Sequence, residues 1–326
     1  MNKSLAKFKR ILKLLLLVIL VILAFFWNFA IIMIIALLLN AKTIYKSLLG
    51  KIPLEVNDDD YRGPNSYTYK KENNKYLSLD IYYPAKSKKM VYPAVFFTHG
   101  GGWISGYKRQ PNNVSWLRYL ASKGFAVISI DYNFCYSSTM DDILNDYGDA
   151  LKYVRENARK LKIDTNNIAL MGLSAGGQLS LLFSAQNTHN KNFEIVQGIK
   201  CVISWYAPCD LMDIWNDGSD SLFARFAITT TLKGLPKKQK EAYKQYSPIN
   251  WVTAKMLPSM LVHGTDDTVV PAESSIKMYE ELRRCNVPST LRLIHGADHG
   301  FEFILKNPQT IKVVEQAVSF LRKHLK

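Results

Sequence analysis

The stretch "IALMGLSAGGQLSLL", residues 168–182, decides the fold of this 326-residue chain. Its first four residues form a short apolar run that suits a buried strand, and the residues after Ser174 suit a helix. Gly172 and Gly176 flank the serine and permit a sharp, strained turn that lifts its hydroxyl out of the backbone. The segment predicts a strand, a tight turn and a helix. A glycine-rich helix start with an incidental serine is the competing interpretation.

Short apolar runs alternate with helical patterns along most of the chain. Strands are expected at residues 76–83, 94–98, 125–130, 168–171, 201–205, 260–263 and 291–295. Helices are expected at about residues 141–161, 175–187, 272–284 and 309–325. This alternation predicts an α/β fold with a mostly parallel sheet that helices cover on both faces. Residues 209–256 break the pattern and are predicted to form a small inserted lid.

A run of three glycines, "HGGGW" at residues 99–103, directly follows one expected strand. With no side chains in the way, backbone N–H groups of such a loop can approach a reacting carbonyl and stabilise the oxyanion that forms on it. A phosphate-binding loop is one alternative, but no Gly-Lys-Ser/Thr follows, and Trp103 is an unusual neighbour for a nucleotide. A purely structural turn is the other.

The loop "HGADHGF", residues 295–301, follows the last expected strand and offers a general base. We expect this base to be His299, because His295 ends the strand and suits a packed position. A Ser-His pair also needs an acidic group that orients the imidazole and stabilises its charged form. The turn "HGTDD" supplies Asp266 and Asp267 after another expected strand, at the same edge of the sheet. Neighbouring side chains point differently, so only one of the two should face the histidine.

At this point the chain resembles a known family. It is similar to the carboxylesterase branch of the α/β-hydrolases, which includes hormone-sensitive-lipase-like acetyl esterases, feruloyl and acetyl-xylan esterases, and kynurenine formamidases. The resemblance runs from about residue 66 to the C-terminus. It is carried by "LDIYYP", "HGGGWISG", "ISIDYN", "DTNNIALMGLSAGGQLS", "YSPINWV", "HGTDDTVVP" and "GADHGF". In this order the motifs are specific for the superfamily and much less so for one substrate.

The resemblance implies roles for individual residues. Asp266 becomes a loop neighbour of the acid, and the substrate pocket is tentatively placed at Trp103, Tyr206 and Trp215. One departure matters, because Asn133 stands where relatives usually have an arginine, which leaves substrate assignments near residues 133–138 open. The implied site consists of the nucleophile Ser174, the base His299, the acid Asp267, and the backbone N–H groups of Gly101, Gly102 and Ala175 as oxyanion donors.

The implied activity is that of a serine carboxylester hydrolase acting on short-acyl, acetyl-type esters, with no metal and no organic cofactor. Two other functions stay open. One is a membrane-anchored amidase or peptidase of the same fold, and the other is a non-catalytic binding module. The sequence does not identify the ester or the oligomeric state.

The N-terminal part of the chain predicts a membrane anchor. Residues 14–39 contain no charge, and as a helix they would extend about 39 Å, enough to cross a hydrocarbon core of about 30 Å. A cleaved signal peptide is the competing interpretation, but the apolar run is too long for one. We expect a basic segment at 1–13, a transmembrane helix at 14–39, a tether at 40–62 and the α/β-hydrolase domain at 63–326. Five Lys/Arg before the span against three after it favour a cytoplasmic N-terminus and an exported catalytic domain at the cell membrane.

The formal net charge is +15, and residues 63–326 contribute +10 of it, from 33 Lys/Arg minus 23 Asp/Glu. No basic run interleaved with aromatics and no nucleic-acid motif is present, so no nucleic-acid partner is expected. A generally lysine-rich, solvated surface explains the excess, and attraction to an anionic membrane or wall is the alternative. The four cysteines show no C-x-x-C spacing and predict neither a zinc site nor a redox motif.

Overall fold

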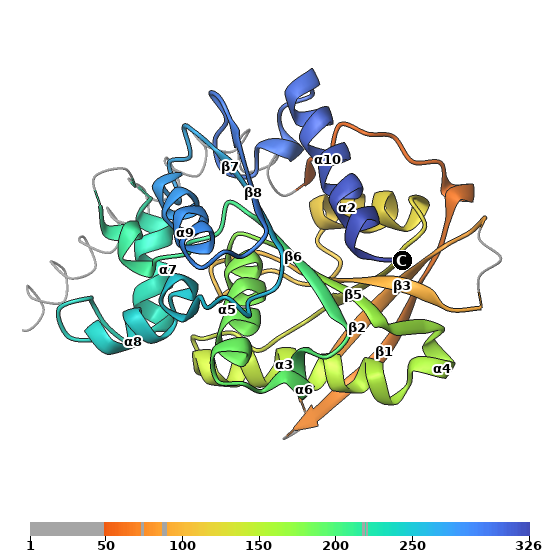
Figure 1. Ribbon diagram of the computed structural model, residues 1–326, viewed down its shortest axis with the longest axis horizontal. Coiled ribbons are helices and arrows are strands. Elements are labelled where there is room, and N and C mark those ends of the chain that lie inside the picture. The colour runs from red at the N-terminus through yellow and green to blue at the C-terminus, as the bar shows by residue number, and fades with distance from the viewer. Residues whose placement is uncertain (1–48, 73–74, 87–89, 217–218, 220) are drawn as a thin grey trace, which may run out of the picture. The chain divides into compact units, whose positions relative to one another are not determined.

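An eight-stranded sheet in the order β1-β2-β4-β3-β5-β6-β7-β8 organises the computed structural model (Figure 1). The structure describes residues 49–72, 75–86, 90–216, 219 and 221–326. Strand β2 runs antiparallel to β1 and β4, and all other neighbours are parallel. The strands are β1 (Tyr61–Glu72), β2 (Lys75–Pro84), β3 (Tyr92–Thr98), β4 (Ala126–Ile130), β5 (Ile163–Leu173), β6 (Ile199–Trp205), β7 (Ser259–Gly264) and β8 (Ser289–Ile294).

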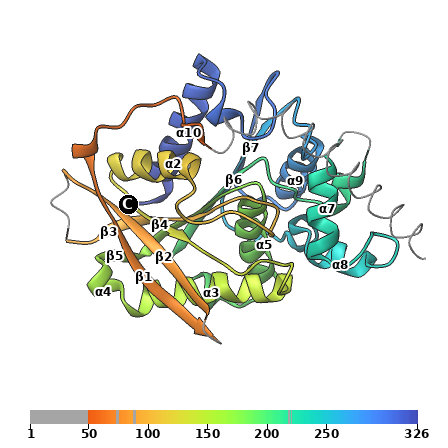
Figure 2. The same ribbon diagram turned by 180° about the vertical axis from the view of Figure 1, so that it is seen from behind.

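Helices cover both faces of the sheet (Figures 1 and 2). Helices α2 and α10 pack on one face, and α3, α5 and α9 pack on the other. The helices are α2 (Pro111–Ser122), α3 (Met140–Glu156), α4 (Ala158–Leu161), α5 (Ala175–His189), α6 (Phe193–Val196), α7 (Leu222–Thr231), α8 (Lys240–Gln245), α9 (Glu273–Arg284) and α10 (Pro308–His324). The short 3-10 helices are η1 (Asp58–Asp60), η2 (Leu211–Trp215), η3 (Pro248–Trp251) and η4 (Phe301–Phe303).

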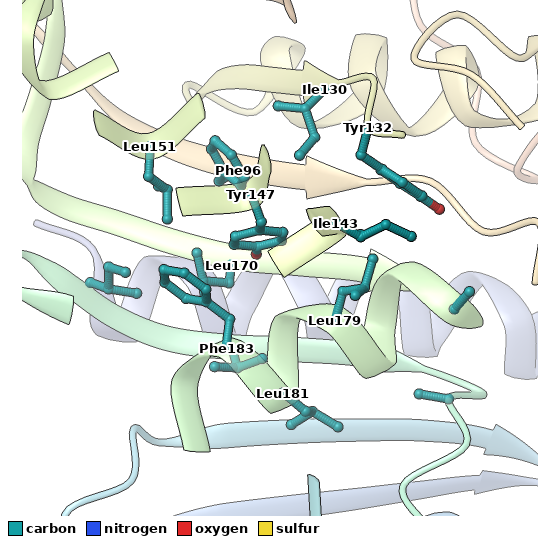
Figure 3. Packing of buried hydrophobic residues seen from close by; sticks show 14 of the residues in the cluster. Phe96, Ile130, Tyr132, Ile143, Tyr147, Leu151, Leu170, Leu179, Leu181 and Phe183 are labelled. Carbon is teal, nitrogen blue, oxygen red and sulfur yellow. The ribbon is translucent and has the colours of Figure 1, made fainter. Parts of the chain in front are cut away.

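The central strands are apolar on both sides because both sides are covered. In β3, Phe96 packs under α3 and α5, whereas its neighbour Phe97 packs under α2 and α10. Figure 3 shows the first of these layers, where the rings of Phe96 and Tyr147 lie 5.0 Å apart. Burying one such side chain contributes about 1.5–3 kcal/mol. The two apolar layers therefore hold β3 and β5 rigidly, and these strands position the site described below.

The predicted α/β architecture is confirmed, and each expected strand has a counterpart, although β5 begins five residues earlier than expected. The helix expected at 141–161 is divided at Asn157 into α3 and α4. Strand β1 and helices α2 and α6 were not predicted. Residues 209–256 form an insertion between β6 and β7 that contains η2, α7, α8 and η3. Its function as a lid remains a prediction.

The predicted transmembrane helix, the basic segment before it and the start of the tether lie outside the described residues. Among the residues that are described, none of the helices is long and apolar enough to cross a membrane. The compact unit begins at Leu49, before the boundary predicted at residue 63. Ile52 is buried, and its N–H donates to Ser115 Oγ at 3.1 Å. The last residues of the predicted tether thus pack on the domain, since their apolar side chains find a place beside α2.

Candidate active site

Ser174 lies at the turn between β5 and α5 in a strained conformation. Its φ is 52°, in the left-handed region that non-glycine residues rarely adopt. The turn is possible because its flanking glycines lack side chains. A Cβ on Gly172 would lie 2.2 Å from the backbone of Gly176, and one on Gly176 would lie 2.2 Å from the carbonyl oxygen of Thr98. The serine hydroxyl is thereby presented at the carboxyl edge of the sheet, as the sequence predicted.

A serine, a histidine and an aspartate form one hydrogen-bonded chain at this edge. Ser174 Oγ lies 2.9 Å from His299 Nε2. His299 Nδ1 lies 2.7 Å from Asp267 Oδ2. The three residues come from the ends of β5, β7 and β8 and are far apart in sequence, so the sheet brings them together. His299 retains 18% of its side-chain exposure, whereas the Asp267 side chain is fully buried.

The two neighbouring aspartates have different surroundings. Asp266 is exposed and accepts a hydrogen bond from Thr265 Oγ1 at 2.7 Å. Asp267 Oδ1 accepts from the backbone N–H groups of Val269 and Val270, both at 2.8 Å. The structure therefore brings Asp267, and not Asp266, to His299. His295 is exposed at the end of β8 and takes no part in the chain.

A second imidazole contacts the same carboxylate. His263 is fully buried, and its Nε2 lies 3.2 Å from Asp267 Oδ2 and 2.9 Å from the carbonyl oxygen of Val270. Its Nδ1 lies 2.7 Å from Ser275 Oγ. The ring therefore donates from Nε2 toward Asp267 and accepts at Nδ1 from the serine hydroxyl. This second contact to the acid was not predicted from the sequence, although "HGTDD" places the two residues in one turn.

The pKa values follow from these contacts. Burial alone would raise the pKa of Asp267, but His299, His263 and their hydrogen bonds hold it below its usual range. Burial alone would lower the pKa of His299, but Asp267 outweighs burial and raises it above the ordinary value. The site can therefore keep Asp267 ionised while His299 exchanges a proton with Ser174.

The glycine loop lies directly beside the serine. A Cβ on Gly100 would lie 3.3 Å from Ser174 Cβ, so the two backbones approach closely. Gly101 and Gly102 have φ values of 116° and 61°, which glycine adopts without strain. In the described part of the chain their N–H groups have no hydrogen-bond partner. Ala175 is the first residue of α5, so its N–H has no partner within the helix. These three donors are available to an oxygen atom near Ser174.

Trp103 and the insertion support this loop. Trp103 is 2% exposed, and its Nε1 donates to Gln178 Oε1 of α5 at 2.9 Å. The indole predicted to line a substrate pocket is therefore packed against the helix that follows Ser174. On the other side of the loop, a Cβ on Gly102 would lie 2.8 Å from Ala227 and 3.3 Å from the Phe223 ring. Helix α7 thus covers the loop that offers the N–H groups.

The other two predicted pocket residues differ from each other. Tyr206 is buried, and its ring lies 4.5 Å from the His299 ring, so it forms the floor under the imidazole. Trp215 lies within the insertion, where its Nε1 donates to the Tyr243 hydroxyl at 3.2 Å and the Arg225 guanidinium lies 5.7 Å from its ring. The structure brings Tyr206 to the site, while the hydrogen bond and the cation–π contact of Trp215 stay within the insertion.

Sequence reasoning missed Glu302, which is fully buried in η4. The Tyr206 hydroxyl donates to Glu302 Oε1 at 2.5 Å, and Trp116 Nε1 lies 3.5 Å from the same oxygen. Oε2 has no partner among the described residues. Burial raises the pKa of Glu302 to about 7. The only sequence signal is a glutamate between two phenylalanines directly after "DHG", which by itself identifies nothing.

Asn133, the departure from the family pattern, lies away from the serine. Its backbone N–H and its side-chain amide donate to Asp146 Oδ2 at 2.9 and 3.0 Å. Lys70 Nζ binds the other oxygen of Asp146 at 2.9 Å. Asn133 is thus held in a polar network between β1 and α3.

The four cysteines are free thiols. Within the described residues no cluster of His, Cys, Asp and Glu side chains is arranged to hold a metal ion.

The architecture and the site together define the class of the protein. An eight-stranded, mostly parallel sheet carries a strained serine turn, a histidine loop and an aspartate turn at the carboxyl ends of its strands. This is the α/β-hydrolase fold. The BD-FAE family model matches residues 79–282, more than half of the chain, so the chain belongs to this family.

Named relatives agree with this membership. Esterase LipC of Mycobacterium tuberculosis is 29% identical over 69% of this chain. A probable isoprenylcysteine alpha-carbonyl methylesterase of Oryza sativa is 28% identical over 74% of this chain. The chain spans 57% and 60% of the length of these two relatives.

Solved structures show the same fold over most of the chain. A truncated carbohydrate esterase from gut microbiota has a TM-score of 0.67 and 24% identity, and covers 83% of this chain and 99% of its own. Thermogutta terrifontis esterase 2 phosphorylated by paraoxon matches with a TM-score of 0.63 and 26% identity. The match covers 80% of this chain and 94% of the esterase chain. These similarities agree with the α/β-hydrolase fold, and the relatives and solved structures named here are themselves esterases.

Proposed function

We propose that the protein is a serine carboxylester hydrolase that uses Ser174, His299 and Asp267 as its catalytic triad. The observation that carries the proposal is the continuous hydrogen-bonded chain from Ser174 Oγ through His299 to the buried Asp267. Hydrolysis of esters by serine attack needs this sequence of nucleophile, base and acid. The esterase names of the relatives support the same reaction.

The mechanism follows from the positions of the groups. Ser174 Oγ attacks the ester carbonyl while His299 Nε2 takes its proton. The N–H groups of Gly101, Gly102 and Ala175 bind the oxyanion, and each such donor is worth about 2.7–4 kcal/mol in related sites. The imidazolium then protonates the departing alcohol. A water molecule, deprotonated by His299, attacks the acyl-serine and releases the acid.

The substrate is proposed to be an ester of a short acyl group. Helix α7 covers the glycine loop closely, with Ala227 and Phe223 against Gly102, which leaves little room for a long chain on that side. The names of the relatives, which include a carbohydrate esterase and a probable methylesterase, do not point to one substrate, so the alcohol is left open.

The N-terminal apolar segment is proposed to anchor the protein in the cell membrane with the catalytic domain outside. The proposal rests on the uncharged residues 14–39 and on the Lys/Arg excess before them. Labelling of a cysteine introduced at position 45 by a membrane-impermeant maleimide in intact cells tests the orientation. Labelling only after lysis would reverse it, and release of the protein from membranes by alkaline carbonate would rule out a spanning anchor.

Hydrolysis of p-nitrophenyl acetate, butyrate and octanoate by the detergent-solubilised full chain tests the activity. We expect acetate to be cleaved fastest and Ser174→Ala to lower kcat/KM by about 10⁶-fold. A fluorophosphonate probe should label the wild type and not this variant. A folded protein that the probe labels but that cleaves no ester would favour the amidase alternative. One that the probe does not label would favour the binding module.

A further inference from the structure

Helix α7 carries three large apolar side chains that the domain does not cover. Leu222 is 80% exposed, Phe226 64% and Phe223 51%. Leu222 and Phe226 are four residues apart and share one side of the helix, while Ala227 and Ile228 are buried against the domain. A cluster of exposed large apolar side chains indicates a surface that contacts something apolar.

The segment that contains α7 and α8 is also strongly basic. Residues 222–245 hold six Lys/Arg and one Asp/Glu, a net charge of +5 (6 − 1), which is half of the +10 carried by residues 63–326. The segment is therefore strongly positive over its 24 residues. Four lysines of the segment are exposed and form no ion pair with the described residues: Lys237, Lys238, Lys240 and Lys244.

The apolar and the basic parts belong to neighbouring elements. Figures 1 and 2 both place α7 and α8 side by side at one end of the sheet. The hydroxyl of Tyr243 in α8 donates to the carbonyl of Gly234, just after α7, at 3.3 Å. Apolar side chains flanked by lysines are the composition of segments that lie on anionic lipid surfaces.

Two further features favour a bilayer over another protein as the partner. An apolar segment predicted to span the membrane ends at residue 39, and residues 40–48 would extend at most about 32 Å, so a bilayer would stay within reach of the domain. The first described residues also pack near the start of α2, the helix that follows the glycine loop, because the Ile52 N–H donates to Ser115 Oγ.

We propose that the surface formed by α7 and α8 docks on an anionic lipid bilayer and turns the carboxyl edge of the sheet toward the membrane. Phe223 connects this surface to the site, because its ring lies against Gly102 of the glycine loop. Resting on the proposed function, the docking assigns as substrate class short-acyl esters held at the bilayer surface, whose small acyl group would reach Ser174 beside Phe223. The docking itself does not require hydrolysis.

Amide hydrogen exchange of the full chain in lipid nanodiscs tests the docking. The protein is reconstituted in discs of phosphatidylcholine alone and in discs that also contain phosphatidylglycerol, so the N-terminal segment is embedded equally in both. We expect the amides of α7 to exchange about tenfold more slowly in the anionic discs. Amides of α10, which packs on the opposite face of the sheet from α3, α5 and α9, should exchange equally in both and serve as the internal control.

Two variants separate the apolar and the basic contributions. The apolar variant combines Leu222→Gln with Phe226→Gln. The basic variant combines Lys237→Gln, Lys238→Gln, Lys240→Gln and Lys244→Gln. Each should abolish the lipid-dependent protection. All of these side chains are exposed, so the fold should tolerate the changes. The matched controls are Met90→Gln with Tyr76→Gln, and Gln at the exposed residues Lys152, Lys160, Lys191 and Lys200. They remove two exposed large apolar side chains and four positive charges elsewhere and should keep the protection.

Equal exchange of α7 in the two kinds of disc would overturn the proposal. So would protection of α7 that rises with protein concentration in detergent without lipid, because the partner would then be a second copy of the chain. Hydrolysis of p-nitrophenyl acetate in detergent distinguishes failure of the docking proposal from failure of the proposed function. The docking variants should cleave it normally, while Ser174→Ala should dock and not cleave.

Discussion

Asp267 and Glu302 are both buried carboxyl groups near His299, yet the protein surrounds them differently. Asp267 receives two backbone N–H groups on one oxygen and two imidazoles on the other. Glu302 receives the Tyr206 hydroxyl and a long contact from Trp116 on one oxygen, and the other oxygen has no partner among the described residues. The pKa of Asp267 is lowered as a result, whereas burial raises the pKa of Glu302 to about 7.

The comparison shows that burial alone does not determine the charge of a group in this site. Asp267 is permanently ionised because the donors around it replace the water it has lost. Glu302 changes its charge near neutral pH because its donors are too few. The charge of Asp267 is thus fixed, and this residue orients His299 through a hydrogen bond. The charge of Glu302 is variable, and it acts on His299 electrostatically, with its hydrogen bond going to Tyr206.

The largest effect should come from removing the fixed charge. Asp267→Asn is expected to lower kcat/KM for p-nitrophenyl acetate by about 10⁴-fold, because the amide cannot stabilise the imidazolium or select its tautomer. The matched control is Asp266→Asn, which changes the adjacent exposed residue and should leave kcat/KM within twofold of the wild type. Equal losses of kcat/KM in the two variants would show that the conformation of the turn, and not the charge of Asp267, is what hydrolysis requires. The contrast between Asp267 and Glu302 would then not apply.

The variable charge should be visible in the free energy of unfolding. Glu302 holds its proton up to about pH 7 in the folded protein, while in the unfolded chain it releases it near its ordinary value of 4.5. The folded state thus binds more protons between these values, so this group makes the protein less stable as pH rises through that window. Glu302→Gln should remove this loss and gain up to about 3 kcal/mol relative to the wild type on going from pH 5 to pH 8.

Urea unfolding followed by tryptophan fluorescence at the two pH values measures this difference. Any packing cost of the glutamine is the same at both pH values and cancels. Glu281→Gln is a useful control, because Arg284 lowers the pKa of Glu281, so its contribution is nearly complete above its ordinary value of 4.5 and should change little between pH 5 and pH 8. A wild-type minus variant difference that is constant with pH would show that Glu302 does not titrate in this range.

The contrast between the two carboxylates also marks what the sequence can predict. Ser174, Asp267 and His299 stand in short motifs whose local backbone gives each its role, and the order of strands brings them to one edge. Glu302 meets Tyr206 across 96 residues. Its importance depends on long-range packing that no local pattern encodes. Only the number of donors around each carboxylate, which the fold determines, distinguishes the fixed charge from the variable one.

Strand β1 and helix α2 were not predicted for equally physical reasons. Strand β1 contains Gly63 and Pro64 near its start, which indicate a turn. As an edge strand with register shifts it also shows no clear alternation of buried and exposed residues. Helix α2 buries the polar residues Asn112 and Asn113 in its first turn, which obscures its apolar period. The central strands were predictable because they are apolar on both faces.

The smallest expected effect concerns the pH dependence of hydrolysis. His299 must be neutral to accept the serine proton, so kcat/KM should rise with pH and reach half its maximum above the ordinary histidine pKa of 6.5, because Asp267 and the nearby Glu302 raise the pKa of His299. Removing one of these negative charges disfavours the imidazolium. Glu302→Gln should therefore move the acidic limb of the pH–rate profile to lower pH, by up to about one unit, with little change in the maximum. Glu281→Gln removes a partly exposed carboxylate that pairs with Arg284 of the same helix, so it should leave the limb in place. A limb that stays in place in Glu302→Gln would mean that the variable carboxylate is electrostatically separate from the base.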